Sequence, residues 1–173
     1  MNAERTVFID AAALWARQAP SWAAWCAAAR GEQQPAPAIK PNPSLLSPNE
    51  RRRASDSVLL ALDVAEQAVR ASGRDASQLA SVFTSAHGDL AVTDALCAQL
   101  ASAPLQLSPT RFHHSVHNAA SGYWAIATGC PAPSTAVSAH RHSFVGGLLE
   151  APVHCPCERE PVLLVGYHPE ARG

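Results

Sequence analysis

The chain has 173 residues, which is enough for one domain with a hydrophobic core. Its net charge of −1, with a single lysine, excludes the clustered positive charge that nucleic-acid binding requires. No apolar run reaches the ~18 residues of a membrane span, and the first residues lack the pattern of a signal peptide, so we expect a cytoplasmic protein with no membrane partner.

The N-terminal part predicts short elements followed by a loop. An apolar stretch predicts a strand at residues 6–10, and alanine-rich stretches predict helices at 11–17 and 21–29, separated by Pro20. Residues 31–47 are rich in proline, which removes backbone donors and opposes helix formation. We therefore expect a loop there.

The clearest helix signal follows that loop. Ser47 and Glu50 have the spacing of a capping box, and Pro48 occupies the first helical position, where its missing N–H costs nothing. Apolar residues then recur at helical spacing, and Gly73 is placed to end the helix. This pattern predicts one helix over residues 47–72.

Strands and helices alternate in the rest of the chain. Apolar runs predict strands at 80–85, 134–139 and 161–167, the second of them central in the sheet. Helices are predicted at 89–102, 119–128 and 142–151, with a histidine-rich loop between the first two and a second loop after residue 151. This alternation is typical of an α/β layered domain with a largely buried sheet, and we treat residues 1–173 as a single domain.

Three segments together resemble the N-terminal half of a β-ketoacyl synthase of the thiolase-like superfamily. They are residues 46–52 (LSPNERR), residues 82–89 (VFTSAHGD) and residues 107–122 (LSPTRFHHSVHNAASG). The last is the most specific, since ketosynthases carry a similar phenylalanine–polar–serine–valine run before a small-residue helix. The resemblance covers residues 44–167 and is nearest to the chain-length-factor group, whose members accompany an active ketosynthase in type II polyketide and aryl polyene systems.

The resemblance also shows what this chain lacks. In the family a strand ends at a cysteine that begins a buried helix, whose dipole lowers the thiol pKa. The corresponding stretch, residues 134–151, contains no cysteine, and the family's cysteine position falls at His140. The family's two catalytic histidines belong to a C-terminal half, whereas this sequence ends at Gly173. The resemblance therefore implies a subunit that does not catalyse condensation alone.

The resemblance implies roles for particular residues. His140 and its neighbours would fill the space of the missing cysteine, and Phe112, Trp124 and Phe144 would line or plug an acyl channel. The family's dimer pairs across the strand before the cysteine position, which implies an interface at Ser134, Thr135, Ala136, Val137 and Ser138. The expected partners are an active ketosynthase, in a heterodimer, and an acyl carrier protein. No bound cofactor is expected, since the phosphopantetheine-linked acyl group would be a ligand.

Two other functions stay open. An acyltransferase or decarboxylase that uses His140 with Ser138 or Ser143 is one, although the sequence has no Gly-x-Ser-x-Gly turn. The other is a degenerate, truncated ketosynthase with no function of its own.

The remaining motifs have simpler interpretations. Five cysteines, an odd number, indicate reduced thiols. The histidines and the Cys155–Cys157 pair complete none of the familiar zinc spacings, so no metal is expected. Arg51, Arg52 and Arg53 form either a solvated helix face or a contact for the carrier protein.

Overall fold

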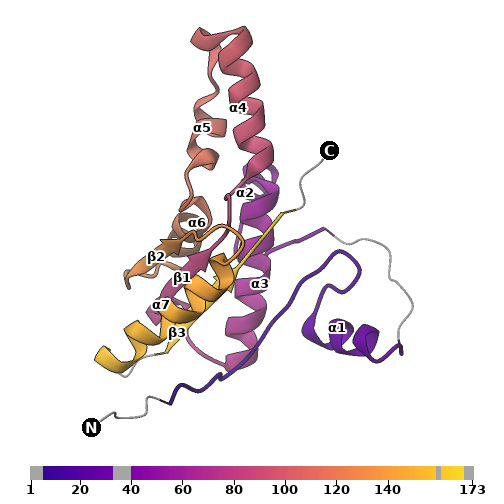
Figure 1. The fold of residues 1–173 in the computed structure, drawn as a ribbon, viewed down its shortest axis with the longest axis vertical. Coiled ribbons are helices and arrows are strands. Elements are labelled where there is room, and N and C mark those ends of the chain that lie inside the picture. Colours follow the sequence, from indigo (N-terminus) through magenta and orange to yellow (C-terminus); the bar gives the residue numbers. More distant parts are fainter. Residues whose placement is uncertain (1–5, 33–39, 159–160, 170–173) are drawn as a thin grey trace.

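The computed structural model describes residues 6–32, 40–158 and 161–169, apart from the side chains of 155–158, and it has an α/β fold (Figure 1). Three strands, β1 (Ala80–Thr84), β2 (Ser134–Val137) and β3 (Val162–Gly166), form a parallel sheet in the order β2-β1-β3. Ser81 lies opposite Ser134 on one side and Leu163 on the other. The predicted α/β architecture is confirmed.

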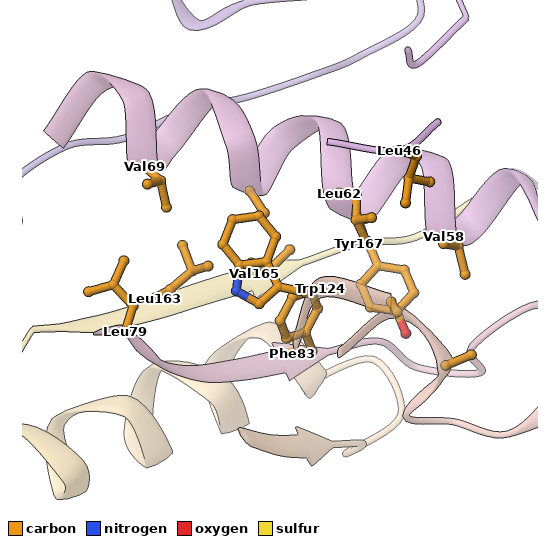
Figure 2. Packing of buried hydrophobic residues seen from close by; sticks show 14 residues of the cluster. Leu46, Val58, Leu62, Val69, Leu79, Phe83, Trp124, Leu163, Val165 and Tyr167 are labelled. Carbon is orange, nitrogen blue, oxygen red and sulfur yellow. The ribbon is translucent and has the colours of Figure 1, made fainter. Parts of the chain in front are cut away.

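Helices cover both faces of this sheet. Helix α7 (Ser143–Glu158) packs against β1 and β3 on one face, while α3 (Asp56–Ser72) and α6 (Ala119–Thr128) pack on the other. Side chains alternate between the faces, as the pleat of a strand requires. Phe83 and Val165 therefore point toward α3 (Figure 2). Leu164 instead approaches Gly147 of α7. The arrangement leaves the carboxyl ends of all three strands at one edge.

The hydrophobic core lies between the sheet and α3. Trp124 of α6 and Phe83 of β1 are its largest fully buried side chains, and Leu62 and Val58 reach them from α3 (Figure 2). Burying a side chain of this size contributes about 1.5–3 kcal/mol. Tyr167, directly after β3, closes the cluster at the carboxyl edge of the sheet.

The predicted helix over residues 47–72 is two helices, so that prediction was wrong in its extent. Helix α2 spans Pro48–Arg53, and the backbone is extended at Ala54 before α3 begins. Ser55 causes the break, because its hydroxyl accepts a hydrogen bond from the amide of Val58 and starts a second helix. The predicted capping box and the left-handed Gly73, with φ of 67°, are both confirmed.

The N-terminal predictions were correct only in part. Helix α1 spans Trp22–Ala29 with Ser21 as its N-cap, as expected. Residues 6–10 form no strand, because no strand in the described parts of the chain lies beside them. Residues 11–17 form no helix and instead lead into a tight turn, in which Ala16 and Ala19 exchange backbone hydrogen bonds.

The proline-rich loop is confirmed where it can be followed. Residues 40–47 have no regular secondary structure, and residues 33–39 lie outside the described part. The carboxylate of Glu66 on α3 accepts hydrogen bonds from the amide and hydroxyl of Ser44 and from the amide of Leu45. This carboxylate holds the loop against α3 and so places Leu46 in the core.

Two helices form an arm that projects from the sheet (Figure 1). Helix α4 spans Leu90–Ser102, close to its prediction, and α5 spans Pro109–Ser115. The second replaces part of the predicted histidine-rich loop, because Pro109 takes the first helical position and Ser108 caps it. Short 3₁₀ turns at Ala76–Gln78 and Pro104–Gln106 complete the connections.

The last elements also differ from their predictions. Strand β2 lies at the edge of the sheet and not at its centre, since β1 alone has two neighbours. Helix α7 extends to Glu158, so the backbone of Cys155 and Cys157 is helical where a loop was expected. The helix therefore continues past its predicted end at residue 151 and through Pro152. Within the described residues, no helix combines the length and apolar character needed to cross a bilayer.

Gly147 allows α7 to approach the sheet, and we predict that it tolerates no side chain. A Cβ there would lie 2.9 Å from both Thr84 Cγ2 and Leu164 Cδ1. Thr84 cannot move easily, since its hydroxyl donates to the Ser143 carbonyl at 2.6 Å. Overpacking costs roughly 1–3 kcal/mol, against about 1 kcal/mol gained in helix propensity. We therefore expect Gly147→Ala to lower the free energy of unfolding, and Gly147→Val to lower it further.

The control for this prediction is Gly122, in the middle of α6. A Cβ there would meet no atom within 4 Å, so Gly122→Ala is expected to stabilise the chain by up to about 1 kcal/mol. Urea denaturation of all three variants measures both effects. A stabilising Gly147→Ala would show that the close approach of α7 is not required.

Asp89 makes the stability depend on pH. Its carboxylate caps α4 by accepting from the Val92 amide at 3.0 Å and holds α3 by accepting from the Ser57 hydroxyl at 2.8 Å. Burial raises the pKa of this carboxyl, but the hydrogen bonds outweigh burial and hold the pKa of Asp89 below its ordinary value. The resulting stabilisation is present above the unfolded pKa of about 3.9 and is lost as the pH falls through the folded pKa.

We expect Asp89→Asn to lower stability at neutral pH by roughly 1.5–3 kcal/mol, as for other hydrogen bonds to a charged group. The variant should also lose less stability than the parent chain when the pH is lowered below about 4. Unfolding followed by circular dichroism over a pH series tests this. Asp94→Asn, at an exposed position on the same helix, is the control. Equal acid sensitivity of Asp89→Asn and the parent chain would contradict the assignment.

Candidate functional site

A pocket lies at the carboxyl edge of the sheet, where ligands bind in open α/β structures. Its volume is about 370 Å³. It is bounded by the ends of β1 and β3 and by the turn that joins β2 to α7. The described residues that line it are Thr84, Ser85, Ala86, His140, Arg141, Ser143, Phe144, Gly166, Tyr167 and His168.

The turn from β2 to α7 is strained at one residue. His140 has φ of 51°, and it is the only residue other than glycine with positive φ in the described part of the chain. A left-handed conformation costs about 1–2 kcal/mol for a residue with a Cβ, so the surrounding structure must hold it. Such positions are concentrated at functional sites.

Ser143 holds the strained turn in place. Its hydroxyl accepts from the Ala139 amide at 2.9 Å and donates to the His140 carbonyl at 2.6 Å, so it closes the backbone on both sides of His140. The Ser143 carbonyl in turn accepts from the hydroxyl of Thr84 at the end of β1. The side chain of Ser143 is buried. Ser143 therefore links the turn to the end of β1.

A second set of hydrogen bonds supports the floor of the pocket. The amide of Ser85 donates to the carbonyl of Val137, and the hydroxyl of Ser138 donates to the carbonyl of Ala86 at 2.9 Å. Burial, and secondly the charge of Asp89, raise the pKa of Tyr167 to about 12. Its hydroxyl therefore stays protonated at neutral pH and donates to the carbonyl of His117 at 3.3 Å.

The four predicted channel residues do not meet at one place. His140 and Phe144 both line the pocket. Trp124 is only 1% exposed and belongs to the core, on the opposite face of the sheet. Phe112 is 62% exposed on α5, in the projecting arm. Of the predicted set, the structure therefore brings together only His140 and Phe144.

The predicted interface strand has one open edge. Ser134 and Ser138 are exposed, and Thr135, Ala136 and Val137 are partly buried. Strand β2 pairs with β1 on one side, and no strand in the described residues pairs with its other side. The edge therefore presents backbone donors and acceptors to solvent, which makes it a template for a further strand.

The serine–histidine pair of the alternative enzyme is not formed. The hydroxyls of Ser138 and Ser143 donate to backbone carbonyls and not to the imidazole of His140. The nearest aromatic neighbour of that ring is His87, edge to face, with centroids 5.8 Å apart. A serine nucleophile needs a hydrogen bond to its base, and neither serine makes one here.

His114 lies outside this pocket and has structural surroundings. His114 of α5 is buried and stacks on Tyr123, and its ring nitrogens have no hydrogen-bond partner of ordinary geometry among the described residues. Burial, followed by the charge of His113, lowers the pKa of His114. Among the residues that the structure describes, no group of histidine, cysteine or carboxylate side chains has the arrangement of a metal site.

Sequence reasoning missed several residues of the pocket. Thr84 and Ser85 end β1, and Gly166, Tyr167 and His168 end β3. The signal that could have found them is topological, since parallel strands bring their carboxyl ends to one edge. A Cβ at Gly166 would lie 2.5 Å from Phe144, so that glycine makes room for the ring.

The fold, with its strained turn between strand and helix, is that of a known protein family. The family model of the β-ketoacyl synthase N-terminal domain matches residues 22–171, and the chain belongs to that family. A comparison with curated proteins gave no significant match.

Two solved structures show what the chain is similar to. One is described as a ketosynthase (ApeO) in complex with its chain length factor (ApeC) from Xenorhabdus doucetiae, with a TM-score of 0.73 and 30% identity. The match covers 92% of this chain and 65% of that chain, so the chain spans about two thirds of its length. The other, a β-ketoacyl synthase from Burkholderia phymatum, matches at a TM-score of 0.59 and 11% identity over 72% of this chain and 32% of that chain. The second likeness shows the fold alone.

The strain at His140 leads to a stability prediction. Glycine adopts positive φ without steric cost, so His140→Gly should raise the free energy of unfolding by about 0.5–1 kcal/mol, once the greater freedom of glycine in the unfolded chain is included. His140→Ala keeps the strain and should give no gain. His142→Gly, where there is no positive φ to relieve, should destabilise. Denaturant unfolding compares the three variants, and a destabilising His140→Gly would refute the strained turn.

Proposed function

We propose that this chain is a non-catalytic, ketosynthase-like subunit of the chain-length-factor type. It pairs in the cytoplasm with an active β-ketoacyl synthase of type II fatty-acid or polyketide assembly, of the aryl polyene kind. There it stabilises the active subunit and helps to shape the channel for an acyl chain delivered by an acyl carrier protein. The observation that carries this proposal is the turn at residue 140.

The turn at residue 140 corresponds to the position of the family's nucleophilic cysteine, but it holds a histidine there. The left-handed residue between β2 and α7 is a histidine, and the neighbouring residues 138–143 include no cysteine. An imidazole is a poor acyl carrier compared with a thiolate at a helix N-terminus. The coincidence of the strained backbone with His140 supports the placement of the family's cysteine at this residue.

Two exposed surfaces support pairing: the outer edge of β2 and one side of α7. The outer edge of β2 is open, and the relative with a TM-score of 0.73 is described as part of a ketosynthase complex with its chain length factor. Helix α7 also exposes a line of apolar side chains at helical spacing on the side away from the sheet. They are Val145, Leu148, Leu149 and Val153. Contiguous exposed apolar surface of this kind marks interaction sites.

The test is co-expression with the ketosynthase encoded nearest to this chain, followed by size-exclusion chromatography and an acyl-carrier elongation assay. We expect co-elution and elongation that depends on this chain. A ketosynthase that elutes alone, and that elongates the acyl chain equally well without this chain, would contradict the proposal. Expressed alone, the chain should be poorly soluble, because the outer edge of β2 and the exposed apolar side chains of α7 are then uncovered.

A proline at the open edge tests where pairing occurs. The amides of Ser81 and Ser85 donate to the carbonyls of Pro133 and Val137, so Ala136 lies at an alternate position that directs its N–H outward. Ala136→Pro removes this outward donor without removing a bond to β1, and we expect it to abolish co-elution. Val162→Pro, at the opposite edge of the sheet, is the matched control. Co-elution that survives Ala136→Pro would place the interface elsewhere.

A further inference from the structure

The arm formed by α4 and α5 is held to the rest of the domain by few buried side chains. The two helices pack against each other, and α5 also packs against α6 (Figure 1). Each helix of the arm, described along its whole length, has a single buried residue, Leu96 in α4 and His114 in α5. The large apolar side chain of α5, Phe112, is exposed. The docking of α5 therefore depends on the ring of His114.

The ring of His114 is buried in its neutral form. Its two nitrogens are buried, and neither has a hydrogen-bond partner of ordinary geometry among the described residues. The ring stacks on Tyr123 of α6, with the centroids 5.6 Å apart and the planes at 25°. A positive charge on a ring buried in this way would lose its hydration without gaining hydrogen bonds. The stacked arrangement therefore requires an uncharged imidazole.

The groups that face this ring do not offset the cost of charging it. On α5 itself, His113 lies edge to face with it at 5.6 Å, and two positive charges at this distance would repel each other. On α6, Tyr123 is uncharged at neutral pH, since burial raises the pKa of its hydroxyl. On α2, Glu50 and Arg53 carry opposite charges, and they line a cavity of about 260 Å³ together with His113 and Tyr123.

The docked and undocked states of α5 therefore bind protons differently. Burial, followed by the charge of His113, lowers the pKa of His114, and the backbone of Arg53 and the charge of Asp89 oppose this to a smaller extent. Asp94, the charged residue within α4, is exposed. When α5 leaves α6, the ring reaches water and recovers its ordinary pKa of about 6.5. Docking is then fully stable above that pH and weakens as the pH falls through the lowered pKa of the docked ring.

Both ends of the arm are anchored by hydrogen bonds that a protonated His114 leaves intact. At the start of α4, Asp89 accepts from the hydroxyl of Ser57 at 2.8 Å. After α5, the Nε2 of His117 donates to the carbonyl of Ser85 at 2.9 Å, a bond that a charged His117 ring also makes. Undocking of α5 is therefore a local event between two fixed ends.

We propose that the ring of His114 is a pH-sensitive latch that holds α5 against α6. When the ring is neutral, α5 is docked. When the ring takes up a proton, α5 separates from α6, while α3 and the sheet keep their structure. The inference goes beyond pairing with a ketosynthase and does not depend on it, because every group that it uses belongs to this chain.

Hydrogen–deuterium exchange of the full chain, read by mass spectrometry on dilute protein, tests the latch. The exchange is measured at about pH 7.5 and about pH 5.5, one unit on either side of the ordinary histidine pKa. After correction for the intrinsic effect of pH on exchange, the protection of residues 109–115 should fall by up to about tenfold at the lower pH. The protection of α3 should stay unchanged. Asp89 does not contribute in this interval, since its pKa lies below its ordinary value.

Two outcomes of this measurement overturn the proposal. Unchanged protection of residues 109–115 would show that α5 has no latch. An equal loss of protection in α3 would show that acid unfolds the whole domain and not the arm alone.

Variants of the two neighbouring histidines assign the effect to one ring. His114→Phe keeps a buried ring against Tyr123 but cannot titrate, and His114→Leu is a smaller apolar alternative. In both variants the protection of residues 109–115 should no longer depend on pH. His113→Gln, at an exposed position of the same helix, is the matched control and should keep the dependence, moved to higher pH because a charge that lowers the pKa of His114 is removed. A pH dependence that survives both His114 variants, or that disappears in His113→Gln, would contradict the assignment to His114.

Discussion

The close approach of α7 to the carboxyl end of β1 controls the architecture around the pocket. Gly147 lets the helix rest on the sheet without an intervening side chain, and the hydroxyl of Thr84 reaches the carbonyl of Ser143 in the first turn of the helix. This contact fixes the start of α7, and Ser143 then fixes the backbone on both sides of His140. A helix held a few ångströms further away would leave residue 140 free to relax into an ordinary conformation.

The two faces of the sheet are covered differently. The face of the sheet toward α3 and α6 is buried and contains the large side chains of Trp124 and Phe83. The face toward α7 is thinly covered, and the outer surface of that helix is apolar but exposed. The buried core therefore lies on one side of the sheet, and the exposed apolar side chains of α7 lie on the other. The position of Trp124 in the core follows from this division, since α6 packs on the buried side.

Local signals in the sequence predicted the helices and their ends well where a residue has a single structural role. The capping box at Ser47 and Glu50, the left-handed Gly73 and the helix at residues 119–128 all lie as expected. Prediction failed where a residue can act in two ways. Ser55 started a new helix within an apolar pattern that read as continuous, and Pro109 began a helix where a loop was expected.

The site divides in a similar way. The turn at His140 could be reached from the sequence by resemblance, because a strand, a small residue and a glycine-containing helix follow one another along the chain. Gly166, Tyr167 and His168 could not, because they come to the pocket only through the parallel pairing of β3 with β1. Phe112 was grouped with the pocket through the resemblance, but it lies on α5, in the arm that projects from the sheet.

The open edge of β2 has a consequence for how the protein is produced. Exposed strand edges and apolar surface are what chaperones and proteases recognise, so a newly made chain is subject to quality control until both are covered. A strand that pairs with β2 would cover this four-residue edge and so protect the chain from that recognition.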